Sequence, residues 1–193
     1  SNIWPMVVIF TVILSSLRLA YIKKYQEKFI FYKEILKLGF IIYIMSLFYV
    51  VTFQDVSWSS SNFIPFKEMF RYEVGSIMFL KNVIGNMIMF MPYGFFISYF
   101  LKADKKSMII YLSTIVSLTI ETTQLIIGRV FDVDDIMLNI LGGLIGFYIY
   151  QFVYLMKSHL PSSLKNNTFY NIIVVIFLLF IFWYLYQILW LGV

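Results

Sequence analysis

Long hydrophobic stretches separated by short polar segments dominate the sequence. A helix that crosses a bilayer needs about 20 mostly apolar residues. Six stretches reach this length, and they are residues 4–22, 35–53, 77–101, 107–127, 136–156 and 168–191. No repeat or linker separates them. The pattern therefore predicts an all-α, polytopic integral membrane protein with about six transmembrane helices, folded as a single membrane domain over residues 1–193.

The charged residues between these stretches predict an orientation in the membrane. Lysines gather in the first, third and fifth connections, at Lys23, Lys24, Lys28, Lys33, Lys102, Lys105, Lys106, Lys157 and Lys165. The second and fourth connections mix basic with acidic residues. Because basic connections stay on the cytoplasmic side, we expect both termini and the second and fourth connections to lie outside.

The composition agrees with a membrane protein and excludes several kinds of site. Hydrophobic residues make up 61% and charged residues 13% of the chain, against about 45–50% and about 25% in soluble domains. The chain has no cysteine and a single histidine, His159, so thiolate and multi-histidine metal sites are excluded. The net charge of +5 comes from lysines that flank hydrophobic stretches. We therefore expect no nucleic-acid partner, no metal and no cofactor.

Polar residues interrupt the third, fourth and fifth stretches, where lipid makes such side chains costly and a functional site is the default hypothesis. They form four groups: Asn82 with Asn86, Glu121 with Gln124, Arg129 with Asp132, Asp134 and Asp135, and Asn139 beside Gly142, Gly143 and Gly146. Because the third and fifth helices would run inward and the fourth outward, all four groups fall in the outer third of the bilayer. We expect them to meet at one level.

Structural interpretations of these groups stay open. The two asparagines could join helices through hydrogen bonds, and the glycines would let the fifth helix approach a neighbour closely. Asp132 or Asp134 could cap the fifth helix. Glu121 would lie about 9 Å below the outer edge, so it must be paired or neutral. The guanidinium of Arg129 suits a phosphate or a carboxylate.

Short motifs follow one another between about residues 60 and 150. They are residues 62–66, 82–86, 90–94, 121–124, 129–135, and Asn139 with residues 142–146. In this order they resemble the VanZ-like family, whose namesake is associated with teicoplanin resistance. The resemblance implies a bacterial plasma-membrane protein and lower sensitivity to lipoglycopeptides, and it implies no mechanism.

Three functions compete for the outer polar residues. In the first, they bind a membrane lipid, a lipid-linked envelope precursor or a lipoglycopeptide, and the ligand-binding residues are Asn82, Asn86, Gln124, Arg129, Asp132 and Asn139. In the second, an intramembrane enzyme uses Glu121 as acid or base, with Asp135 as its catalytic partner. In this enzyme, Asp132 and Asp135 could also hold Mg²⁺ or Ca²⁺. Transport ranks third, because the inner halves of the third to fifth helices look almost wholly apolar. The oligomeric state is not predicted.

Overall fold

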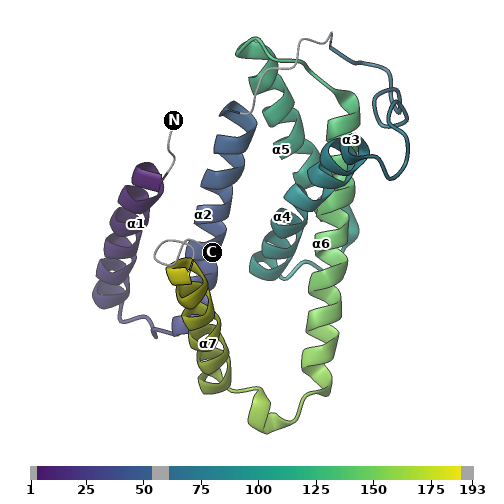
Figure 1. The fold of residues 1–193 in the computed structure, drawn as a ribbon. Helices are drawn as coiled ribbons and strands as arrows, with labels where there is room; N and C mark the ends of the chain where they lie inside the picture. The colour runs from purple at the N-terminus through teal and green to yellow at the C-terminus, as the bar shows by residue number, and fades with distance from the viewer. Residues whose placement is uncertain (1–3, 54–60, 188–193) are drawn as a thin grey trace. The chain divides into compact units, whose positions relative to one another are not determined.

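Helices make up the fold in the part that the computed structural model describes, residues 4–53 and 61–187, and turns and loops connect them (Figure 1). The helices are α1 (Trp4–Tyr25), α2 (Phe31–Phe53), α3 (Ile77–Phe79), the π-helical turn η1 (Leu80–Ile84), α4 (Gly85–Leu101), α5 (Lys106–Ile126), α6 (Val133–His159), the short 3-10 helix η2 (Ser162–Leu164) and α7 (Asn167–Tyr186). No strand forms in these residues, apart from one isolated bridge. The predicted all-α class is confirmed.

Five helical segments of the described chain are long and apolar enough to cross a membrane. They are Pro5–Tyr25, Ile77–Leu101, Lys106–Ile126, Val133–His159 and Asn167–Tyr184. Five of the six predicted spans are therefore confirmed by length and composition. The other predicted span corresponds to α2, a 23-residue helix, and its crossing of the membrane stays a prediction.

Helix α7 is apolar on every side. Residues 172–183 form an unbroken run of aliphatic and aromatic residues, and most of these side chains are exposed. A helix that lies flat in the membrane interface needs a polar face toward the water. Because α7 has no such face along this run, its sequence favours a helix that spans the bilayer over one that lies on it.

The chain divides into two compact units, each of which is described separately. The terminal unit comprises Ser1–Ile42 and Met156–Val193, and the central unit comprises Tyr43–Leu155. The boundaries fall inside α2 and α6, so no break in the hydrophobic pattern marks them. All the polar groups singled out in the sequence lie in the central unit.

Glycines bring α6 into backbone contact with α4 in the central unit. A side chain at Gly142 would overlap the carbonyl oxygen of Met87, and one at Gly146 would overlap that of Met91. From the other side, Gly94 lies against the carbonyl of Gly143. Small residues permit this approach between membrane helices. The predicted role of the glycines as close-packing positions is confirmed, with α4 as the partner.

Aromatic residues of α4 complete the core on its other side. Phe90 is fully buried and packs with Tyr93 and Leu47. The hydroxyl of Tyr43, on α2, donates a hydrogen bond of 2.8 Å to the carbonyl of Met89. The carboxyl-terminal half of α2 therefore packs on α4, while α5 and α6 lie beside α4 in the same unit (Figure 1).

Candidate functional site

The three aspartates at the start of α6 have three different roles. Asp132 is the residue just before the helix, and its Oδ1 accepts a 2.9 Å hydrogen bond from the backbone N–H of Asp134. It is therefore the N-cap that the sequence left undecided between two positions. The same oxygen accepts a 2.9 Å bond from the side-chain amide of Asn62. Burial raises the pKa of the Asp132 carboxyl, and the bond from Asn62 opposes that shift.

Asp134 fixes the loop that precedes α3. Its side chain is 1% exposed. One carboxylate oxygen accepts a bond from the N–H of Phe66, and the other accepts bonds of 2.8 and 2.9 Å from the N–H groups of Glu68 and Met69. A carboxylate with three backbone donors is a strong anchor, because bonds to charged groups exceed those between neutral groups. Asp134 therefore has a structural role.

A short parallel bridge joins the same loop to the α5–α6 connection. The N–H of Asn62 donates to the carbonyl of Phe131 at 2.8 Å, and the N–H of Val133 donates to the carbonyl of Asn62 at 3.1 Å. The rings of Phe63 and Phe131 stack beside this bridge, with centroids 5.3 Å apart. The part of the second connection that the structure describes is thus fastened over the ends of α5 and α6. Residues 54–60 of the predicted external loop lie outside the described residues.

Glu121 is buried beside the α5–α6 connection to which this loop is joined. It is 2% exposed, and its Oε2 accepts a 2.9 Å bond from the backbone N–H of Asp132. The guanidinium of Arg129 and the carboxyl of Asp132 both lie within electrostatic range of Glu121. Asp135 in turn lies within electrostatic range of Glu121 and Asp132. Three acids and one cation therefore meet where α5 ends and α6 begins.

The turn that ends α5 sets the position of Arg129. Gly128 has a φ of 82°, a left-handed conformation that glycine adopts without steric cost. The N–H of Gly128 donates to the carbonyl of Leu125, and the N–H of Arg129 donates to that of Gln124 at 2.8 Å. These two bonds form a Schellman motif. The motif turns the chain sharply, so that Arg129 returns toward the α5 face that carries Glu121.

The two asparagines of the third predicted span do not act together. The side-chain amide of Asn86 donates a hydrogen bond to the carboxylate of Asp135. The amide of Asn82 instead donates to the carbonyl of Met78 in its own helix, at 3.0 Å. Asn82 lies within the π-helical turn η1, Leu80–Ile84, and Asn86 lies in α4 just after it. The rotation about the helix axis from Asn82 to Asn86 therefore differs from that in a regular α-helix. Spacing alone could not reveal this turn.

A buried polar ladder continues below Glu121 along α5. Ser117 and Ser113 are fully buried, and the amide of Asn139 donates to the hydroxyl of Ser117 at 2.9 Å. Ser113 lies against Gly143. The sequence interpretation treated this depth as almost wholly apolar, and that was wrong for α5. The signal was present, because residues 113, 117 and 121 recur at the four-residue spacing of one helix face.

The structure therefore gathers most of the predicted site residues. Asn86, Glu121, Arg129, Asp132, Asp135 and Asn139 line the junction of α4, α5 and α6, and Gln124 is buried on the same face of α5. Asn82 lies apart. Asn62, Asp134 and Ser117 also belong to the network, although the sequence analysis placed none of them among the ligand-binding or catalytic residues. Among the described residues, no three acidic or histidine side chains are arranged to hold a metal ion.

Removal of the Ser117 hydroxyl is expected to weaken the α5–α6 interface. Ser117→Ala would leave the buried amide of Asn139 without its acceptor, at a cost of about 1–3 kcal/mol. Thr114→Ala is a matched control, because its exposed hydroxyl bonds only to its own helix, at Ile110. Thermal unfolding in detergent should separate the two variants. Equal unfolding temperatures would contradict the role given to Ser117.

A comparison with protein families identifies the group to which this chain is related. The sequence model of the VanZ/LLP1 family matches residues 40–156, more than half of the chain. The match begins and ends close to the limits of the central unit, Tyr43–Leu155. It thus includes α4, α5, α6 as far as Met156, and the polar network at their junction. Searches of curated proteins and of solved structures gave no significant match. The chain is a membrane protein that belongs to the VanZ/LLP1 family.

Proposed function

We propose that this is a bacterial plasma-membrane protein whose polar junction binds the headgroup of a lipid, a lipid-linked envelope precursor or an amphiphilic lipoglycopeptide such as teicoplanin. In this proposal the junction lies toward the outer face of the membrane, as the lysine-rich connections predict. Binding of this kind would lower the sensitivity of the cell to lipoglycopeptides. The observation that carries the proposal is the position of Arg129 within electrostatic range of Glu121, the buried acid of α5.

The cation at the junction supports recognition of an oxyanion. Arg129 is partly buried and is held by the Schellman turn. A guanidinium fork binds phosphate or carboxylate with two parallel bonds. The carboxylate of Asp134 is already fully engaged by backbone N–H groups, and one oxygen of Glu121 accepts the N–H of Asp132. These carboxyl groups are thus engaged by the loop and by the α5–α6 connection, which reduces the repulsion that an anionic headgroup would otherwise meet.

The loop above the junction supports recognition of an apolar group. Asn62 and Asp134 hold this loop in place, yet Phe63, Ile64 and Phe70 are between 62% and 76% exposed. Exposed apolar side chains on a fixed loop often mark a binding surface. A ligand with a polar headgroup and a hydrophobic tail would match both features, whereas a fully polar ligand would match only the junction.

Replacement of Arg129 is expected to abolish protection against teicoplanin. In a susceptible bacterial host, Arg129→Ala should return the minimal inhibitory concentration to that of cells without the protein, and Glu121→Gln should do the same. Arg71→Ala and Glu73→Gln are matched controls on the loop; the side chain of Arg71 is 61% exposed and pairs with Glu68. Immunoblots of membranes check that each variant accumulates. Unchanged resistance in an accumulated Arg129→Ala or Glu121→Gln variant would refute the proposal.

A second candidate function is an intramembrane enzyme that uses Glu121 as acid or base. The specific observation in its favour is that Glu121 and Asp135, from α5 and α6, lie within electrostatic range of each other. Paired carboxyl groups can divide acid and base roles. Turnover of a lipid-linked precursor by the purified protein, lost in Glu121→Gln and retained in Glu73→Gln, would favour the enzyme over simple binding.

A further inference from the structure

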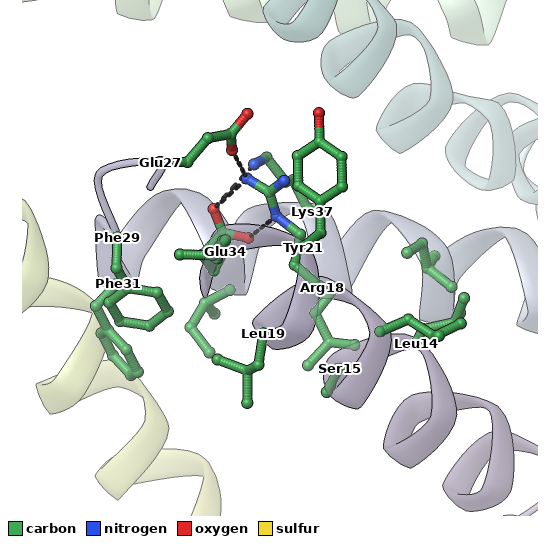
Figure 2. A pocket seen from close by; sticks show the side chains of 15 residues that line it. Leu14, Ser15, Arg18, Leu19, Tyr21, Glu27, Phe29, Phe31, Glu34 and Lys37 are labelled. Carbon is green, nitrogen blue, oxygen red and sulfur yellow. Dashed lines mark hydrogen bonds and ion pairs between the residues drawn. The ribbon is translucent and has the colours of Figure 1, made fainter. Parts of the chain in front are cut away.

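A cavity lies in the terminal unit, apart in sequence from the polar junction. It is lined by α1, α2 and the segment between them, is open on one side, and has a volume of about 790 Å³ (Figure 2). Leu14, Leu19, Phe31 and Leu38 are among its apolar lining residues. This volume is within the range of about 300–1,000 Å³ that is usual for small-molecule sites. The walls are suited to an acyl chain.

A cluster of four charged side chains lines one part of the cavity. Arg18 donates from Nε to Glu34 at 2.9 Å and from Nη2 to Glu27 at 2.8 Å. Lys37 donates from Nζ to the same Glu34 at 2.9 Å. Figure 2 shows these groups together above the apolar side chains of α1 and α2. The structure thus gives Arg18 two acidic partners, one on α2 and one on the segment between the helices.

The two cations of this cluster keep donors that the acids do not use. Within the described residues, the Nη1 of Arg18 makes no hydrogen bond, and Lys37 uses one of its three donors. Glu34 accepts bonds on both oxygens. The hydrogen-bonding groups that remain unused near Glu34 are therefore mainly the N–H donors of Arg18 and Lys37. Such donors suit the oxygens of a phosphate.

The surrounding charges favour an anionic ligand. Four further lysines lie on the segment that joins α1 to α2 or next to it, at Lys23, Lys24, Lys28 and Lys33. With Arg18 and Lys37 they outnumber the carboxylates of Glu27 and Glu34 by six to two. Basic clusters at the end of a membrane helix attract anionic lipid headgroups.

We propose that the terminal unit binds an anionic phospholipid, with one acyl chain in the cavity between α1 and α2 and its phosphate at Arg18 and Lys37. This site involves none of the residues of the polar junction, so it is independent of the proposed function. A lipid here would fill a cavity between two helices, and its phosphate would accept bonds from the donors of Arg18 and Lys37 that Glu27 and Glu34 leave unused.

Native mass spectrometry of the full-length protein, released from detergent in the presence of a defined lipid, tests this site. Phosphatidylglycerol and phosphatidylethanolamine with the same acyl chains are the two probes. We expect phosphatidylglycerol to bind at least about tenfold more tightly, and each of Arg18→Gln and Lys37→Gln to weaken it about fivefold. Leu14→Trp, which fills the cavity, should weaken binding of both lipids.

Lys102→Gln, in the connection between α4 and α5, is the matched control and should leave lipid binding unchanged. Lys37→Gln removes a single bond from a side chain that is 42% exposed, so it tests the site if Arg18→Gln fails to fold. Equal affinities for the two lipids, or unchanged phosphatidylglycerol binding in the folded Lys37→Gln and Leu14→Trp variants, would overturn the proposal.

Discussion

Asp134→Ala is expected to lower the free energy of unfolding of the central unit by roughly 3–5 kcal/mol. The substitution removes the acceptor of three backbone N–H groups, those of Phe66, Glu68 and Met69. Within residues 61–187, the other attachments of this loop to the α5–α6 connection are the bonds of Ser61 and Asn62 and the stacking of Phe63 on Phe131, and none of them holds residues 66–69. We therefore expect the loop to detach from α6 as well as the unit to lose stability.

Two measurements check this prediction. Thermal unfolding in detergent reports the loss of stability, and hydrogen exchange of the peptide that contains residues 62–72 reports the release of the loop. Asp134→Asn should have a smaller effect, since it keeps one acceptor oxygen. Asp104→Ala, at an exposed position between α4 and α5, should change neither quantity. Slow exchange of the Phe66, Glu68 and Met69 amides in Asp134→Ala would show that Asp134 does not hold the loop.

Gly142→Ala is expected to cost roughly 3 kcal/mol, because the added carbon overlaps the backbone carbonyl of Met87. A flexible side chain could move away from such a clash, but a backbone carbonyl in α4 cannot. The two helices must therefore separate. Met87 is the neighbour of Asn86, so this separation should also break the bond from Asn86 to Asp135.

Gly39→Ala is the matched control for this substitution. A carbon added at Gly39 meets nothing within 4 Å, and alanine favours a helix interior over glycine by up to about 1 kcal/mol. Gly39→Ala should therefore unfold at the same or a slightly higher temperature, while Gly142→Ala unfolds at a lower one. A Gly142→Ala protein as stable as Gly39→Ala would mean that α4 and α6 do not pack through their backbones.

Features that depend on one helix at a time could be predicted from the sequence. Hydrophobic length gave the span that corresponds to α3, η1 and α4, and its predicted limits of 77 and 101 coincide with Ile77–Leu101. The glycines of α6 indicated close packing for the same reason, since their spacing puts them on one face. Glu121 could be singled out because an acid is costly at its depth in a membrane.

Features that depend on two segments distant in sequence could not be predicted. Asp132 and Asp134 are equivalent as candidate caps, and only the position of the 61–69 loop shows that Asp134 holds that loop instead. The separation of Asn82 from Asn86 depends on η1, which has no distinctive sequence. Arg18 acquires its role from Glu34, which lies on the next helix.

The central claim is that the junction of α4, α5 and α6 binds a polar headgroup beside Arg129. Electron cryomicroscopy of the full-length protein tests this claim most directly. The protein would be placed in nanodiscs of bacterial lipid with teicoplanin or a lipid-linked precursor added, and a bound antibody fragment would enlarge the particle for alignment. We predict density for a headgroup in contact with Arg129 and an attached chain along Phe63 and Phe70, absent in Arg129→Ala. The claim would be contradicted if the wild-type protein showed no such density at teicoplanin concentrations against which it protects cells.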